Sequence, residues 1–134
     1  MDADLKNFVI SSEELSSKLN DENIILLDSR WSLDTKHSSI IDYKKSHIPS
    51  SIFFDLNKFF DFSSKSLHTL PTEEQFINAV SDIGIKNKNK IIIYDANGFF
   101  NSCRVWFMFK AFGHDDIVIL DGGYENKKKK NLPI

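Results

Sequence analysis

The chain has 134 residues, of which 41% are hydrophobic and 27% are charged, and its net charge is -2. This length suits one globular domain with a real core and is too short for two. The nearly balanced charge argues against a large nucleic-acid or anionic-membrane surface, and no apolar run approaches the roughly 20 residues that cross a bilayer. The polar start has no signal-peptide pattern and the single cysteine excludes an internal disulfide, so we expect a cytoplasmic protein.

The first half of the chain alternates helix and strand patterns. Ser11 and Glu14 have the spacing of a capping box, which predicts that a helix begins there. The continuous apolar run 24–27 is typical of a strand buried on both faces, and residues 52–54 predict a second, shorter strand. Between these strands, residues 40–45 predict a short helix.

The second half continues this alternation. Thr72 and Gln75 form another capping-box pattern, which begins a helix with an apolar stripe. The central strand is expected at residues 90–94, an apolar helix from about 102 to 112, and the last strand at 117–120. Strands that alternate with helices predict a single α/β domain with a mostly parallel sheet and helices on both faces.

The most informative segment is the turn from the central strand into the apolar helix. In an open parallel sheet such turns hold substrates and anions, because the following helix presents unpaired N–H groups at its N-terminus. Asp95 comes directly after the strand, whereas Cys103, the only cysteine, lies well down the connection. A carboxylate and not a thiol is therefore expected at the end of the central strand.

Short motifs spaced along the chain resemble a known family. They are Asp28-Ser29-Arg30-Trp31, His47-Ile48-Pro49, Ile93-Tyr94-Asp95, Arg104-Val105-Trp106, Phe112-Gly113-His114, Leu120-Asp121-Gly122-Gly123 and Asn131-Leu132-Pro133. In this order they resemble the N-terminal domain of the two-domain rhodanese family, the thiosulfate and 3-mercaptopyruvate sulfurtransferases. The resemblance covers residues 1–134 as one rhodanese-like domain. It implies a tandem architecture in which a cysteine of the second domain transfers sulfur without a metal or an organic cofactor.

In this resemblance Asp95 occupies the position of the catalytic cysteine. A carboxylate is not a nucleophile for sulfane sulfur, and its charge repels thiosulfate or cyanide. The resemblance therefore implies a non-catalytic half that is inactive alone and shapes the cleft of a catalytic rhodanese domain. A truncated gene product would show the same sequence pattern. One departure from the family is Ser50-Ser51, which replaces the usual Gly-Ala pair and predicts a less tight turn.

Cys103 supports the main alternative. At a predicted helix N-terminus beside Arg104, its thiol lies where the thiolate form is favoured, which would suit a stand-alone sulfurtransferase. Its other interpretation is a small residue that packs the first turn of the helix. A third function, a module that binds a protein or an anion without chemistry, also stays open.

Four further polar residues have two interpretations each. Asp28 and Arg30 follow the end of a strand, and they either line a cleft or hold neighbouring loops together by hydrogen bonds. His47 either transfers protons in a complete enzyme or fixes the turn before Pro49 through a backbone contact. Arg104 is either an anion contact or part of a structural ion pair. The other histidines do not have the spacing of metal ligands, so no metal site is expected.

Aromatic residues near the central turn predict a contact surface. Phe99 and Phe100 are adjacent in a loop, where two phenylalanines seldom stay exposed without a partner. With Phe59–Phe62 they are expected to face a catalytic rhodanese domain or, without it, to drive self-association. Phe107 and Met108 are expected in the core or in an interface. We expect no nucleic-acid and no membrane partner.

Overall fold

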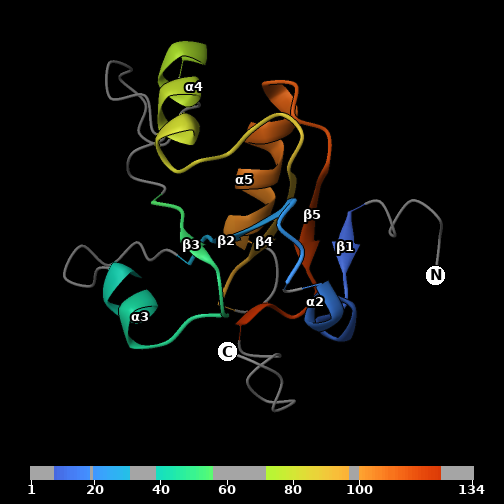
Figure 1. Cartoon of the computed structure of the whole chain (residues 1–134). Coiled ribbons are helices and arrows are strands. Elements are labelled where there is room, and N and C mark those ends of the chain that lie inside the picture. The colour runs from blue at the N-terminus through green and yellow to red at the C-terminus, as the bar shows by residue number, and fades with distance from the viewer. Residues whose placement is uncertain (1–7, 19, 31–38, 56–71, 97–99, 125–134) are drawn as a thin grey trace.

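A single parallel sheet organises the chain (Figure 1). The computed structural model describes residues 8–18, 20–30, 39–55, 72–96 and 100–124. The strands in this part are β1 (Val9–Ile10), β2 (Ile24–Asp28), β3 (Ile52–Phe53), β4 (Lys90–Tyr94) and β5 (Ile117–Leu120). The helices are α2 (Ser12–Lys18), α3 (Ser39–Lys45), α4 (Glu73–Asp82) and α5 (Phe100–Ala111).

The strand order is β1-β5-β4-β2-β3, and every neighbouring pair is parallel. The central strand β4 lies between β5 and β2, and its register places Asp28 beside Tyr94 at the end of the ladder. Because all strands run in one direction, their carboxyl ends meet at one edge of the sheet. The predicted α/β fold with a parallel sheet is therefore confirmed.

Alternate side chains of the strands enter two separate cores. The core that holds α4 and α5 against the sheet includes Leu27, Phe76, Ile91, Ile93, Met108 and Phe109. The core on the other face includes Ile10, Leu15, Leu26, Ile48, Ile92, Tyr94 and Tyr124. Successive residues of a strand point to opposite faces, so a strand covered on both sides carries a continuous apolar run, as β4 does at Ile91–Ile93. Helices therefore cover both faces of the sheet, as predicted.

The predicted capping box is complete at the start of α4, and one of its two contacts is present at the start of α2. The Thr72 hydroxyl accepts from the Gln75 backbone N–H at 3.2 Å, and the Gln75 side chain accepts from the Thr72 N–H at 2.9 Å. At α2 the Ser11 hydroxyl accepts from the Glu14 N–H at 3.1 Å. None of the described helices has the length and apolar character of a membrane-spanning helix.

The turn at Pro49 is tight, although Ser50-Ser51 had predicted a looser one. The Ser51 N–H donates to the Ile48 carbonyl at 3.0 Å and so closes a β-turn. Ser50 has a φ of 69°, in the left-handed region that favours glycine, and no other non-glycine residue of the described part has a positive φ. The replacement of the small pair therefore leaves the turn closed and places backbone strain at Ser50.

Candidate functional site

Buried polar side chains gather at the carboxyl ends of the central strands. This edge is where open parallel sheets bind their ligands. Asp28 ends β2, Tyr94 ends β4 directly beside it, and Asp95 follows Tyr94. Ser29 and Arg30 continue from β2, and all five side chains are buried.

Asp28 and Arg30 form a buried ion pair. Asp28 is 0% exposed, and its Oδ2 lies 2.7 Å from Arg30 Nη2 and 3.0 Å from Arg30 Nε. The Arg30 backbone N–H also donates to Asp28 Oδ1 at 3.0 Å. Burial by itself lowers the pKa of Arg30, but the hydrogen bond and the charge of Asp28 outweigh it, and the net pKa is raised. Arg30 therefore stays charged and holds the carboxylate in a fixed, forked geometry.

Tyr94 connects this pair to the chain around Pro49. Its hydroxyl donates to Asp28 Oδ2 at 2.8 Å, lies 2.9 Å from Ser51 Oγ and accepts from the Ile48 N–H at 3.3 Å. Burial and the charge of Asp28 raise the pKa of Tyr94. The phenol is therefore a neutral donor that ties β4 to β2 and to the start of β3.

Arg30 has a second set of contacts on its other side. Its Nη2 donates to the Ser46 carbonyl at 2.8 Å, and its Cζ lies 4.4 Å from the centre of the Tyr124 ring. The Ser46 and Tyr124 hydroxyls are hydrogen-bonded to each other, and the Tyr124 N–H donates to the Asp95 carbonyl at 2.8 Å. Arg30 thus joins the segment after α3 to the turn after β5 and, through Tyr124, to the end of β4.

His47 lies at the end of the segment that follows α3. Its Nδ1 lies 2.7 Å from the Tyr43 carbonyl, and its ring stacks on the Tyr43 ring with centroids 4.0 Å apart. A carbonyl can only accept, so Nδ1 carries the proton in this contact. The ring is therefore held by α3, just before the turn at Pro49.

Asp95 lies in the interior at the end of β4. It is 4% exposed, and its Oδ1 accepts from the Ala96 N–H at 2.8 Å. The turn after β5 packs directly on this strand end, since a Cβ at Gly123 would lie 2.5 Å from the Asp95 carbonyl oxygen. The carboxylate is thus held where the family resemblance places a catalytic cysteine.

Cys103 lies on the solvent side of α5, whereas its neighbour Ser102 is fully buried. The helix begins at Phe100, slightly earlier than the predicted start at about 102, and the Ser102 hydroxyl lies 3.2 Å from Ser29 Oγ. Cys103 is therefore one turn inside the helix and not at its first residue. Beside it, burial lowers the pKa of Arg104, which is partly buried.

Some predicted site residues lie outside the described part of the chain. These are Phe99 and the segment Phe59–Phe62; Phe100 is described as the first residue of α5. Within the described ranges, no three His, Cys, Asp or Glu side chains gather as metal ligands would.

Sequence reasoning missed Tyr94 and Tyr124, which complete the network. A signal for Tyr94 was available: its hydroxyl-bearing ring ends β4 directly after a run of isoleucines. Tyr124 had no such signal, because its contact with Arg30 joins segments that are far apart in the sequence.

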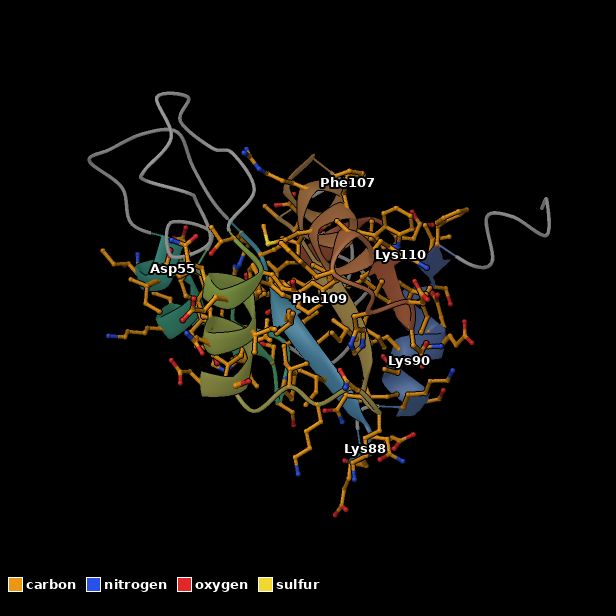
Figure 2. All side chains as sticks on the ribbon, turned by 90° about the horizontal axis from the view of Figure 1, so that it is seen from above. Asp55, Lys88, Lys90, Phe107, Phe109 and Lys110 are labelled. Carbon is orange, nitrogen blue, oxygen red and sulfur yellow. The ribbon has the colours of Figure 1, made fainter. Side chains whose placement is uncertain are left out.

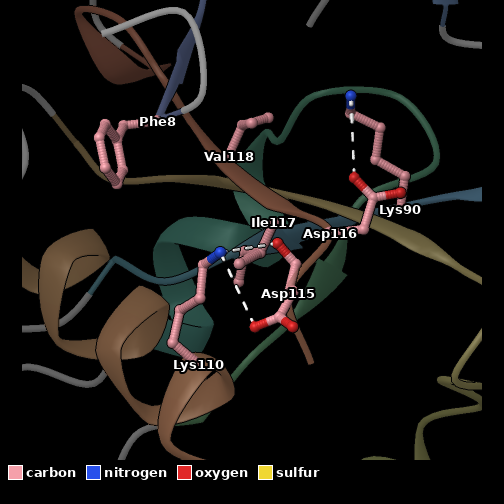
Figure 3. A pocket seen from close by; sticks show the side chains of 7 residues that line it. All are labelled: Phe8, Lys90, Lys110, Asp115, Asp116, Ile117 and Val118. Atoms are coloured by element: carbon pink, nitrogen blue, oxygen red, sulfur yellow. Dashed lines mark hydrogen bonds and ion pairs between the residues drawn. The ribbon is translucent and has the colours of Figure 1, made fainter. Parts of the chain in front are cut away.

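A separate hollow of about 500 Å³ lies at the amino ends of β4 and β5, away from the strand carboxyl ends (Figure 3). Its lysines are already engaged. Lys110 Nζ donates to the Asp115 carbonyl at 2.9 Å, and Lys90 Nζ lies 3.9 Å from Asp116 Oδ1. The hollow thus has balanced charge and takes no part in the site described above.

Known proteins share this fold and parts of this sequence. The chain is 41% identical over 116 residues to thiosulfate/3-mercaptopyruvate sulfurtransferase 2 of Arabidopsis thaliana, covering 86% of this chain and 34% of the relative. It is 33% identical over 126 residues to human (Homo sapiens) 3-mercaptopyruvate sulfurtransferase, covering 92% and 42%. The crystal structure of SseA from Escherichia coli, described as having the rhodanese fold, superposes with a TM-score of 0.90 at 27% identity, covering 95% of this chain and 49% of that one.

The chain therefore spans less than half the length of each of these relatives. The model of the rhodanese-like domain nevertheless matches residues 11–130, which is most of the chain. Together with the parallel sheet described above, this match shows that the chain belongs to the rhodanese family, with relatives among the thiosulfate and 3-mercaptopyruvate sulfurtransferases.

Proposed function

We propose that this chain is a non-catalytic, cleft-forming half of a sulfurtransferase, and that a separate domain carries out the sulfur transfer. The observation that carries the proposal is Asp95 at the end of β4. A carboxylate at this position offers no thiol to accept sulfur, and it repels anionic donors. The only thiol of the chain, Cys103, instead faces solvent on α5.

The hydrogen bonds of the site support a structural role. In the part of the chain that the structure describes, no buried side-chain nitrogen or oxygen lacks a partner. Asp28, Arg30 and Tyr94 are satisfied by one another and by nearby backbone groups. Such a network suits the shaping of loops around a cleft more than the binding of a substrate.

In the complete enzyme, a cysteine thiolate of the partner domain attacks the sulfur of thiosulfate or 3-mercaptopyruvate. The S–S bond of thiosulfate breaks and sulfite leaves, or the C–S bond of 3-mercaptopyruvate breaks and its carbon takes up the thiol proton to give pyruvate. In both cases the transferred sulfur stays on the cysteine as a persulfide. Cyanide or a thiol then takes the outer sulfur and the thiolate is restored. The relatives are named for these two donors, which supports this choice. No step needs a metal or an organic cofactor.

The test is a chimera in which this chain replaces the matching segment of the Arabidopsis relative that is 41% identical. We expect the chimera to produce thiocyanate from thiosulfate or 3-mercaptopyruvate and cyanide, and the isolated chain to produce none. The control is the same relative with the matching segment deleted. A chimera no more active than this deletion would refute the proposal.

The second candidate function is a stand-alone sulfurtransferase, and the exposed thiol of Cys103 is the observation that favours it. Thiocyanate production by the isolated chain that disappears in Cys103→Ala would establish this function. Intact-mass measurement after donor treatment gives an independent readout, because a persulfide adds about 32 Da to the protein. We expect no such adduct on Cys103.

A binding module without chemistry is the third candidate. It would be supported if the isolated chain captured a protein or an anion while the chimera stayed inactive.

We also propose a cytoplasmic location, because one unpaired cysteine suits a reducing compartment. One relative is named as mitochondrial. Fluorescence microscopy of the tagged protein distinguishes a cytoplasmic from a mitochondrial location.

A further inference from the structure

The outer face of α5 is apolar although it faces solvent. Phe107 is 57% exposed, and Cys103, four residues before it, is exposed as well. Ala111 is also exposed and continues the same line, because positions four apart lie on one side of a helix. In Figure 2, Phe107 lies on the outer side of α5 and Phe109 lies between the helix and the sheet. We call Cys103, Phe107 and Ala111 the outer α5 stripe.

The charged residues of α5 are few, and none of them lies in the outer α5 stripe. The helix has no acidic residue, and Arg104 and Lys110 are its only charged ones. Its inner side is fully covered, since Val105, Met108 and Phe109 are buried against the sheet. An exposed apolar line that spans about two helical turns and has a large aromatic ring at its centre is typical of a contact surface, so the outer α5 stripe predicts a contact with another molecule or domain.

Other exposed apolar residues in the described part do not form such a stripe. Ile41 on α3 and Ile77 on α4 are about half exposed, but both helices carry several charged residues. Single exposed apolar side chains of this kind are common and need no partner. They serve instead as matched controls for Phe107.

We propose that the outer α5 stripe is the docking surface for the catalytic domain of the proposed sulfurtransferase. This inference rests on the proposed function and assigns a surface to its partner. The helix α5 follows the carboxyl end of β4 in the chain, so Cys103, in the first part of α5, is the member of the stripe nearest to Asp95 in the sequence. This chain corresponds to 49% of the matched Escherichia coli chain. The remaining half of that chain is long enough for a second domain.

The charges beside the outer α5 stripe favour this partner over a second copy of the chain. In an antiparallel pair of α5 helices centred on Phe107, Arg104 of one copy would face Lys110 of the other. In a parallel pair each cation would face its own counterpart. Both arrangements bring like charges together, which is unfavourable at an interface. A partner with an apolar centre and an acidic rim fits the same surface.

Cys103 gives a direct readout of this contact, because it is the only cysteine in the chain. Iodoacetamide labelling of Cys103 is followed by peptide mass spectrometry in the isolated chain and in the chimera described above. We expect labelling in the chimera to be slower by about tenfold or more, since a docked domain excludes the reagent. Equal rates in an active chimera would overturn the docking surface and leave the proposed function standing.

Two variants of the chimera separate this surface from general destabilisation. Phe107→Asp is expected to restore the labelling of Cys103 and to lower thiocyanate production, whereas Ile77→Asp, at a residue with 51% exposure, leaves both unchanged. Circular dichroism of the isolated variants checks that both fold, because both side chains lie at the surface.

The remaining outcomes are also decisive. An inactive chimera with Cys103 unprotected would overturn both the docking surface and the proposed function. Concentration-dependent protection of Cys103 in the isolated chain, with a dimer in light scattering that Phe107→Asp abolishes, would assign the stripe to a second copy and refute the inference.

Discussion

Removal of the Arg30 guanidinium should test whether the buried ion pair holds the site together. In Arg30→Met the side chain keeps an apolar stem of similar length, but the fully buried Asp28 carboxylate loses two side-chain donors, at 2.7 and 3.0 Å. An uncompensated buried charge costs about 3–5 kcal/mol of unfolding free energy. This is a large share of the roughly 5–15 kcal/mol that stabilises a typical domain.

Urea denaturation followed by tryptophan fluorescence measures this loss. With a slope of about 1–3 kcal/mol/M, the midpoint should fall by at least about 1 M. The control is Lys18→Met, which breaks the surface pair Lys18–Glu14, whose side chains are 36% and 54% exposed. Pairs of this kind contribute about 0.3–0.5 kcal/mol.

An Arg30→Met variant no less stable than Lys18→Met would refute the reasoning. The double variant Asp28→Asn/Arg30→Met gives a second check, because it also removes the unpaired charge. It should recover part of the lost free energy, which shows that charge and not packing causes the loss.

Three further changes test other parts of the structure. Gly123→Ala should lower the unfolding free energy by more than about 2 kcal/mol, because its Cβ would lie 2.5 Å from a backbone oxygen. Gly84→Ala should lower it by about 1 kcal/mol, because no atom lies within 4 Å of that Cβ. Urea midpoints compare the two variants. Ser50→Gly should raise the unfolding free energy by roughly 0.5–1 kcal/mol by relieving its positive φ, and a lower midpoint would contradict this. Folding raises the pKa of Tyr94, so the neutral phenol stabilises the folded state. This stabilisation is complete below the ordinary tyrosine pKa of about 10 and is lost as pH rises above it. Tyr94→Phe should therefore flatten the alkaline fall in unfolding free energy, and an unchanged slope would argue against the assignment.

The fold could be predicted from local patterns in the sequence. The bounds of β4 and β5 agree with their apolar runs, and the Thr72–Gln75 capping box marks the start of α4. These features depend on neighbouring residues, so the sequence alone carries them. The family resemblance led to the same architecture.

The contacts within the site could not be predicted from local sequence patterns. Tyr94 reaches Asp28 only because β2 and β4 pair in one particular register, and Tyr124 reaches Arg30 only after the whole sheet has formed. Long-range packing decided both contacts. The start of α5 also lies slightly earlier than predicted, and Ser102, near that start, makes a further long-range contact with Ser29.

The two cores on either side of β4 make the buried ion pair sensitive to strand slippage. A shift of β4 by one residue would turn the Tyr94 ring toward the α4 and α5 side and move its hydroxyl away from Asp28. The misaligned chain would then bury an acid with one donor fewer and a phenol among apolar side chains. The hydrogen bonds among Asp28, Arg30 and Tyr94 thus destabilise wrong registers of the central strand and favour the native register while the domain folds.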